Sequence, residues 1–341
     1  MIVALDTQLA LGTATGAGVY ARDLAAALRA AGTDVRALSE PRLDPWRFDR
    51  RVLWDQVLLP LAAARSGAAV LHATAGTMPL LRTLPTVVTV HDVAWLRVQA
   101  HTRAYARAYF GALQMRAYRG AAAVVCDSEF SAEEYRALVD PAAHIEVVYP
   151  GVDARFAALA RRPDPEPFAL VVGTVEARKN LLVLVDALAA HPGLRIVSVG
   201  PHTPYAERVR VRAIELGVSD RLELRGYVRS EQLDDLYARA ACALIPSRYE
   251  GFGYALAEAM CAGLPAIAAR SSSLVEVAGG AVPLADPDRP DDWSEALGVL
   301  LADRDGAQRG ADAIRVATVE RFAWETAARR MTAVYERVAR R

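Results

Sequence analysis

Two glutamates, Glu250 and Glu258, are the residues of this sequence whose type and spacing most readily suggest chemistry. They lie in the segment SRYEGFGYALAEAM (residues 247–260), where a glycine-aromatic turn precedes an apolar run. The pair could act as an acid and a base, as two charges on a helix surface, or as two contacts to one ligand. On one continuous helix the carboxylates would lie about 12 Å apart along the axis. This separation exceeds the roughly 5–9.5 Å found between the carboxyl pairs of glycosidases, so it argues against a shared proton relay.

The glycines near Glu250 indicate separate roles for the two carboxylates. Gly251 and Gly253 favour a turn at Glu250 and a helix that begins near Gly253. The free N–H groups at the start of that helix favour an anion. Glu258, one turn into an apolar helix, would be a costly buried charge without a partner, and a vicinal diol such as that of ribose offers it two donors. We therefore expect the two glutamates to contact different parts of one ligand.

Two adjacent cations, Arg178 and Lys179, lie in a loop that follows the apolar run ending at Gly173. Lys179 is the only lysine among forty basic residues, and lysine and arginine bind phosphate differently. Such a pair can neutralise a pyrophosphate leaving group, which is the task of a divalent metal in other enzymes. The alternative is a pair of solvated loop charges.

The first half of the chain offers a glycine turn and a histidine. Gly16 and Gly18 precede a predicted helix that begins near Val19, which suits a phosphate or a sugar hydroxyl; a plain turn is the alternative. The spacing differs from GxGxxG and lacks the Walker lysine, so binding of NAD(P) or of ATP in a P-loop is disfavoured. His91 ends a β-branched run and could bond a sugar hydroxyl, or it could be a core histidine satisfied by Asp92.

Short β-branched runs alternate with helical patterns, which predicts an α/β protein with parallel sheets covered by helices on both faces. The predicted strands are Ile2–Leu5, Val35–Ala37, Ala69–His72, Thr86–His91, Ala123–Asp127, Ile145–Val148, Ala169–Val172, Arg195–Gly200, Leu222–Arg225, Ala241–Ile245, Ala266–Ala269 and Ala281–Leu284. A helix is expected to start with a capping box at Ser131 and Glu134.

The proline-rich stretch before Phe168 predicts a domain boundary. We expect a first Rossmann-like domain (1–155), a linker (156–167), a second Rossmann-like domain (168–320), and a last helix (321–341) that packs across the junction. Ligands of such doubly wound sheets bind beyond the carboxyl ends of the strands, in a cleft.

Composition excludes several classes of protein. Forty basic and forty acidic residues cancel, so no net charge argues for nucleic acid. Cys126, Cys242 and Cys261 are scattered, and neither CxxC nor HExxH occurs, so we expect reduced thiols, a cytoplasmic protein and no zinc site. The N-terminus resembles a first strand more than a signal peptide, and the apolar segment Val52–Ala64 is too short to span a bilayer.

The sequence resembles the retaining glycosyltransferases of family four, which have the GT-B fold, and among them bacterial mannosyltransferases. The strongest likeness is EGFGYALAEAMCAGLPAIA from Glu250. Further matching segments, in order, are Gly16–Tyr20, Trp54–Gln56 with Pro60, His91-Asp92, Cys126–Ser131, Tyr149–Asp153, Val172–Thr174, Arg178–Leu181, Arg225–Val228 and Ser273–Val277. Two positions depart from the pattern, because Thr174 stands where many members carry arginine and Gly251 loosens the turn after Glu250.

The resemblance implies that the N-terminal domain (1–155) is the acceptor side, that the C-terminal domain (168–320) binds the nucleotide sugar, and that no metal or other cofactor is needed. It also implies a role for each candidate residue. Glu250 would contact the transferred sugar and Glu258 the nucleotide ribose, while Arg178 and Lys179 would bind the diphosphate. Backbone groups of Phe252, Gly253 and Tyr254 would face sugar and phosphate, Gly173 would belong to the same donor site, and Tyr227 and Val228 would flank the base. From the first domain, Gly16 and Gly18 would close on the diphosphate and His91 would meet the sugar hydroxyls. Glu250, His91, Lys179 and Arg178 would be the catalytic set.

The implied reaction is metal-independent transfer of a sugar from a nucleoside diphosphate to an acceptor hydroxyl, with retention of the anomeric configuration. GDP-mannose is the expected donor, with UDP- and dTDP-sugars as alternatives, and the acceptor would be a glycan, a lipid-linked sugar or a small aglycone. A sugar-nucleotide epimerase of the same fold and a non-catalytic nucleotide-sugar-binding partner subunit are the alternative functions. A basic and aromatic region with Arg97, Arg103, Arg107, Arg116 and Arg119 could contact the inner face of an anionic membrane, or it could be a solvated helix.

Overall fold

The computed structural model describes residues 1–12, 16–97 and 108–340. The chain forms two compact units, the first made of residues 1–151 and 322–341 and the second of residues 152–321. Each unit contains a six-stranded sheet in which all the strand pairs are parallel. The predicted α/β class and the two doubly wound sheets are confirmed.

The first unit has the strand order β2-β1-β3-β4-β5-β6. Its elements are β1 (Ile2–Asp6), the 3₁₀ helix η1 (Gln8–Ala10), α1 (Ala17–Ala30), β2 (Asp34–Leu38), α2 (Phe48–Leu53), the π-helix η2 (Trp54–Leu58), α3 (Leu59–Arg65), β3 (Val70–Ala73), β4 (Thr86–Val90), α4 (Ala94–Arg97), the π-helix η3 (Ala108–Leu113), α6 (Gln114–Tyr118), β5 (Ala123–Cys126), α7 (Glu129–Leu138), β6 (Ile145–Val147) and α16 (Trp324–Ala339).

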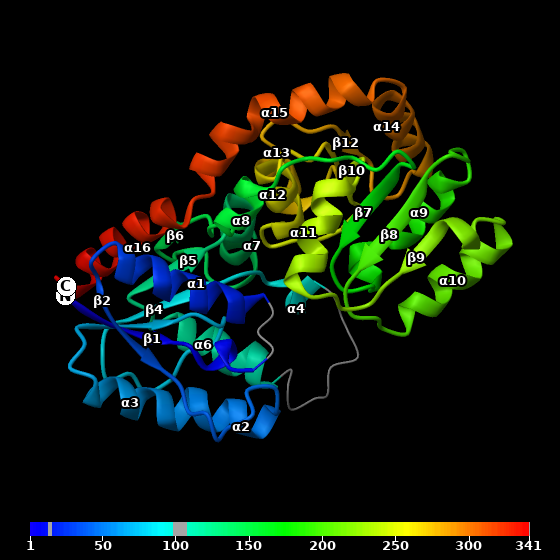
Figure 1. Cartoon of the computed structure of the whole chain (residues 1–341). Helices are drawn as coiled ribbons and strands as arrows, with labels where there is room; N and C mark the ends of the chain where they lie inside the picture. Colours follow the sequence, from blue (N-terminus) through cyan, green and yellow to red (C-terminus); the bar gives the residue numbers. More distant parts are fainter. Residues whose placement is uncertain (13–15, 98–107, 341) are drawn as a thin grey trace. The chain divides into compact units, whose positions relative to one another are not determined.

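Successive side chains of β1 point to opposite faces of this sheet and pack into a separate core on each face. Val3 and Leu5 pack in one cluster with α1 and α16, whereas Ala4 packs in another with η2 and α3. Figure 1 shows α1 beside α16 on one face and α3 on the other. The predicted last helix is therefore α16, which supplies Met331 and Tyr335 to the core of the first unit. Its packing across the domain junction stays a prediction.

The second unit has the strand order β12-β11-β10-β7-β8-β9. Its elements are α8 (Ala154–Ala158), β7 (Phe168–Val172), the 3₁₀ turn η4 (Ala177–Lys179), α9 (Leu181–Leu188), β8 (Arg195–Val199), α10 (Tyr205–Glu215), the 3₁₀ turn η5 (Ser219–Arg221), β9 (Leu222–Leu224), α11 (Ser230–Arg239), β10 (Cys242–Ile245), α12 (Tyr254–Cys261), β11 (Ala266–Ala269), α13 (Ser272–Ala278), β12 (Leu284–Ala285), α14 (Pro290–Ala302) and α15 (Arg304–Arg321).

Three details differ from the sequence prediction. The N-cap of α7 is Ser128, whose side chain accepts a bond from the Ser131 N–H at 3.0 Å, so the helix begins before the predicted capping box. The last strand is shorter and later than predicted, at Leu284–Ala285. The segment predicted as a linker, residues 156–167, lies within the second unit, where the Arg162 N–H donates to the Ala238 carbonyl at 2.9 Å.

Candidate functional site

Glu250 and the two predicted cations form one cluster in the second unit. Lys179 Nζ lies 2.5 Å from Glu250 Oε1, and an Arg178 Nη1 proton is donated to Glu250 Oε2 over 3.1 Å. Arg178 also donates to the Tyr249 carbonyl at 2.7 Å and to the Glu176 carboxylate at 2.9 Å. The sequence prediction that these three side chains share one site therefore agrees with their geometry.

Sheet topology explains why residues so far apart in sequence meet. The cations follow β7 and Glu250 follows β10, and these two strands are paired in parallel. The carboxyl ends of parallel neighbours open at one edge of the sheet, which is where such folds bind ligands. The cluster is thus at the edge expected of a binding site.

Charge in this cluster is arranged to keep Glu250 ionised. Burial alone would raise the pKa of Glu250, but Lys179 and Arg178 outweigh burial and hold the pKa below its ordinary value. Arg178 also pairs with Glu176, so two carboxylates balance the two cations of this cluster. An anionic ligand would therefore have to share the cations with Glu250 and Glu176.

The turn around Glu250 is fixed by hydrogen bonds to the start of α13. The Glu250 N–H donates to Ser272 Oγ at 2.9 Å, and Ser273 Oγ donates to the Glu250 carbonyl at 2.9 Å. Gly253 is the N-cap of α12 with φ 96°, so the helix begins at Tyr254 as the glycine pattern predicted. Phe252 is buried and packs edge-on against Tyr254 with ring centroids 5.3 Å apart. Backbone N–H groups at the start of α12 therefore lie directly after the Glu250 turn.

Glu258 has a different environment from Glu250. Its Oε2 accepts a hydrogen bond from the Tyr237 hydroxyl of α11 at 2.8 Å. Burial raises the pKa of Glu258 to about 7, and the Tyr237 hydrogen bond and Arg155 only partly oppose that rise. The pKa values of the two glutamates therefore shift in opposite directions, and Glu258 holds its proton to higher pH than Glu250.

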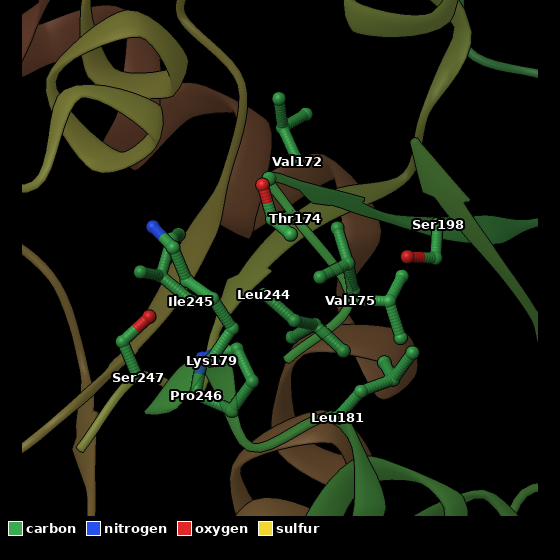
Figure 2. A pocket seen from close by; sticks show the side chains of 12 residues that line it. Val172, Thr174, Val175, Lys179, Leu181, Ser198, Leu244, Ile245, Pro246 and Ser247 are labelled. Carbon is green, nitrogen blue, oxygen red and sulfur yellow. The ribbon is translucent and has the colours of Figure 1, made fainter. Parts of the chain in front are cut away.

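The turn after β7 stands over a small cavity. This cavity, of about 10 Å³, is lined by residues from β7, β8 and β10 and by Gly173, Thr174, Lys179 and Ser247. Figure 2 shows Lys179 and Ser247 on one side and Ser198 on the other. Gly173 has φ 137°, and a Cβ atom there would lie 3.3 Å from Lys179 Cε, so glycine leaves room for the lysine side chain. Thr174, at the position that departs from the family pattern, lies in this turn.

Tyr227 and Val228 lie in the loop between β9 and α11. Tyr227 is among the exposed large hydrophobic side chains, with 69% of its surface accessible. The loop is tied to the β8 end, since the Gly200 N–H donates to the Gly226 carbonyl at 2.8 Å. An exposed aromatic ring at the same sheet edge is suited to stacking on a planar base, and this role stays a prediction.

The first unit holds the remaining predicted residues. Gly16 is the N-cap of α1, and Gly18 lies buried within its first turn, because the helix begins at Ala17 and not near Val19. His91 directly follows β4. Its Nδ1 lies 2.6 Å from Asp127 Oδ2, and its Nε2 lies 2.9 Å from the Thr74 carbonyl oxygen.

His91 is thus satisfied by Asp127 and the Thr74 carbonyl, whereas the alternative interpretation of the sequence had named Asp92 as its partner. The Asp92 carboxylate instead accepts from the Ala94 N–H at 3.0 Å. Burial lowers the pKa of His91, but Asp127 and the Thr74 carbonyl outweigh burial and raise the pKa above its ordinary value. Both ring nitrogens face oxygen acceptors, which favours the doubly protonated imidazolium. A bond from His91 to a sugar hydroxyl stays a prediction.

Other features bear on predicted partners. All three cysteines are buried and free. Within the described ranges, no group of three or more His, Cys, Asp or Glu side chains could hold a metal ion, and no helix has the length and apolar character needed to cross a bilayer. Of the basic region predicted to contact a membrane, Arg103 and Arg107 lie outside the described residues, Arg97 ends α4, Arg116 lies in α6 and Arg119 follows it.

Family models match nearly the whole length of this fold. Residues 14–156 match the model described as Glycosyltransferase Family 4, and residues 156–316 match Glycosyl transferases group 1. The boundary between the two matches lies close to the division between the two units.

Individual relatives agree with this assignment. The chain is 35% identical over 218 residues to a D-inositol 3-phosphate glycosyltransferase of Xylanimonas cellulosilytica, covering 58% of this chain and 52% of that protein. It is 34% identical over 163 residues to the O-antigen chain mannosyltransferase B of Escherichia coli, covering 46% and 42%. The matched part of the chain thus spans about half the length of these relatives or less.

Solved structures show the same fold over nearly the entire chain. A sucrose-phosphate synthase of Thermosynechococcus elongatus has a TM-score of 0.80 at 22% identity, covering 99% of this chain and 98% of that one. HepE of Anabaena, solved with UDP and glucose, has a TM-score of 0.75 at 17% identity, covering 99% and 100%. Taken with the two family matches, the parallel sheets and the Glu250 turn, these likenesses show that the chain belongs to the family-4 glycosyltransferases and has the GT-B fold.

Proposed function

We propose that this protein transfers a sugar from a nucleoside-diphosphate sugar to an acceptor hydroxyl, with retention of configuration and without a metal. The observation that carries the proposal is the junction of Arg178, Lys179 and Glu250 at the carboxyl edge of the second sheet. Two cations there match the charge of a diphosphate, and a buried ionised carboxylate beside them matches a sugar that carries hydroxyl donors.

In the proposed step the anomeric carbon exchanges one oxygen for another. The bond between the anomeric carbon and the diphosphate oxygen breaks, and the bond between that carbon and the acceptor oxygen forms on the same face. The acceptor proton passes to an oxygen of the leaving diphosphate. Arg178, Lys179 and the N-terminus of α12 stabilise the negative charge that develops on the leaving group.

We propose a mannosyl donor, GDP-mannose, in preference to UDP- or dTDP-linked sugars. The support is the similarity to a mannosyltransferase of Escherichia coli, together with the ARKNL form of the cation loop. UDP is the specific alternative, because a fold relative has been solved with UDP and glucose. A glycan, lipid-linked sugar or small aglycone is the proposed acceptor, in the cytoplasm and at the inner face of the membrane for a lipid-linked one.

A donor panel tests the function directly. Purified protein is incubated with GDP-mannose, UDP-glucose and dTDP-glucose, and release of the free nucleoside diphosphate is followed by chromatography. Slow hydrolysis of one donor by the wild-type chain, abolished in Glu250→Gln, supports the proposal, and NMR of the first sugar product gives the anomeric configuration. Interconversion of the donor sugar without release of nucleotide would instead show an epimerase. Binding without any turnover of donor or acceptor would show a non-catalytic partner subunit.

A further inference from the structure

Three polar residues, Asn180, Arg248 and Asp288, connect three loops of the second unit. Asn180 ends the turn that carries the two cations, Arg248 lies in the turn after β10, and Asp288 lies after β12. We name these three residues the loop clamp. Its members are far apart in sequence, and Arg248 links them, because it donates hydrogen bonds to both Asn180 and Asp288.

Asn180 has an unusual backbone and an unusual use of its side chain. It is buried, with φ 56° and ψ 36°, a left-handed conformation that asparagine tolerates better than most residues. It is also the N-cap of α9, where an asparagine side chain ordinarily bonds its own helix. Here the side chain makes no such bond; its Nδ2 donates to the Pro287 carbonyl at 2.6 Å, and its Oδ1 accepts from the Arg248 guanidinium.

Arg248 holds the cation turn at two points. Its backbone N–H donates to the Arg178 carbonyl at 2.9 Å, while its side chain donates to Asn180. The rest of the guanidinium is oriented by Asp288 Oδ1, which accepts from Nε at 2.9 Å and from Nη2 at 2.6 Å. The backbone before and after Lys179 is therefore fastened by one residue of the neighbouring turn.

The exposure of Arg248 and Asp288 indicates that their ion pair does more than stabilise the fold. The Arg248 and Asp288 side chains are 46% and 67% exposed, and ion pairs between such exposed groups contribute little to stability. Their hydrogen bonds nevertheless fix the position of the backbone that carries Arg178 and Lys179. Asn180 also fastens the segment Asp286–Asp288, which the sequence alone gave no reason to connect with the site.

We propose that the loop clamp positions Arg178 and Lys179 for the diphosphate of the sugar nucleotide. This inference rests on the proposed function. Glu250 forms ion pairs with the charged groups of Arg178 and Lys179. A bound diphosphate must share these two cations with Glu250. The backbone beneath the cations therefore has to be held by contacts that the ligand does not disturb, and the clamp provides them. Asn180, Arg248 and Asp288 are positioning residues that touch no ligand themselves.

Asn180→Gly is the sharpest test, because glycine adopts positive φ without strain and the variant loses only the side-chain contacts. Titration calorimetry measures Kd for GDP and UDP, and for guanosine and uridine, which lack the diphosphate. We expect the Kd of the preferred nucleoside diphosphate to rise about tenfold while the Kd of its nucleoside stays unchanged. Asp288→Ala should weaken diphosphate binding in the same way, and Asp288→Asn, which keeps the accepting Oδ1, should retain it.

Arg210→Gln is the matched control, because it removes a comparably exposed arginine from an ion pair with Glu207 on α10. It should leave every Kd unchanged. Wild-type affinity for the diphosphate in Asn180→Gly and Asp288→Ala would overturn the clamp, as would an equal loss for nucleoside and diphosphate. If Asn180→Gly fails to fold, Asp288→Ala decides alone. Failure of the wild-type chain to bind GDP, UDP or GDP-mannose would instead overturn the proposed function, and the clamp with it.

Discussion

Replacing Glu258 by glutamine should remove a specific pH dependence of stability. The pKa of Glu258 in the folded protein is about 7, compared with an ordinary value of 4.5. The folded state therefore holds a proton that the unfolded state has lost between these two values. Because the folded state binds more protons there, this group's contribution makes the protein less stable as pH rises from about 4.5 to 7.

The magnitude follows from the two pKa values. Between pH 5.5 and pH 8 the ionisation of Glu258 should lower the free energy of unfolding by about 2 kcal/mol. Denaturant unfolding measures the free energy of unfolding of the wild type and of Glu258→Gln at both pH values. Subtracting one protein from the other removes the contributions of the titrating groups that they share. Tyr237 can still donate its hydroxyl proton to the glutamine carbonyl oxygen, so the variant removes the charge and keeps that contact.

Ligand affinity should respond in the opposite direction. A ribose diol donates to a carboxylate, so the affinity for a nucleoside should increase as Glu258 ionises between pH 6 and pH 8. In Glu258→Gln this increase should be absent. Equal pH dependence of unfolding in the two proteins would refute the reasoning on burial, and equal pH dependence of nucleoside affinity would refute the ribose assignment.

Three further perturbations test the site and its support. Glu250→Gln should lower turnover about 10²-fold or more, because the sugar loses its ionised contact. Diphosphate affinity should hold or improve, because Lys179 and Arg178 lose their ion pairs with Glu250. Full turnover in a coupled assay would contradict the assigned role. Gly253→Ala should lower the free energy of unfolding by about 1–3 kcal/mol, since φ is 96° and the new Cβ would lie 2.6 Å from Leu274 Cδ2. Gly310→Ala, whose Cβ has nothing within 4 Å, is its control and should not destabilise. His91→Gln should destabilise most at low pH, because the raised pKa stabilises the folded protein below the ordinary histidine value and that contribution disappears as pH rises through the raised value. A pH-independent difference in unfolding free energy would show that folding does not raise the pKa of His91.

The strands of both sheets were predictable, because buried parallel strands are continuous apolar runs rich in β-branched residues. Each predicted range overlaps a strand from β1 to β12. The poorest match is β12, a short edge strand whose position is set by pairing of Leu284 with Ala268 of β11 and not by its own composition. Helices α14 and α15 were not predicted. Only Ala311 and Thr318 are buried in α15, so its sequence lacks a strong apolar stripe.

The site was predictable where one short segment determines it. The turn at Glu250 and the start of α12 follow from the glycines around them, and the two cations are adjacent in the chain. Hydrogen-bond partners from different elements of the fold could not be predicted from a local sequence pattern. Tyr237 reaches Glu258 from another helix, and Asp127 reaches His91 from the end of the neighbouring strand β5. Tertiary packing brings these side chains together, and local periodicity does not encode it.

The first unit is assembled from two separate pieces of chain, and this has a consequence for biosynthesis. On the ribosome, residues 322–341 are made only after all of the second unit. Until then the face of the first sheet that receives Met331 and Tyr335 stays open, and His72 lacks the Tyr335 hydroxyl that lies 2.6 Å from its Nδ1. The second unit, whose residues are contiguous, can complete its core first. The part of the N-terminal sheet that α16 covers therefore stays exposed for the time needed to translate the second unit.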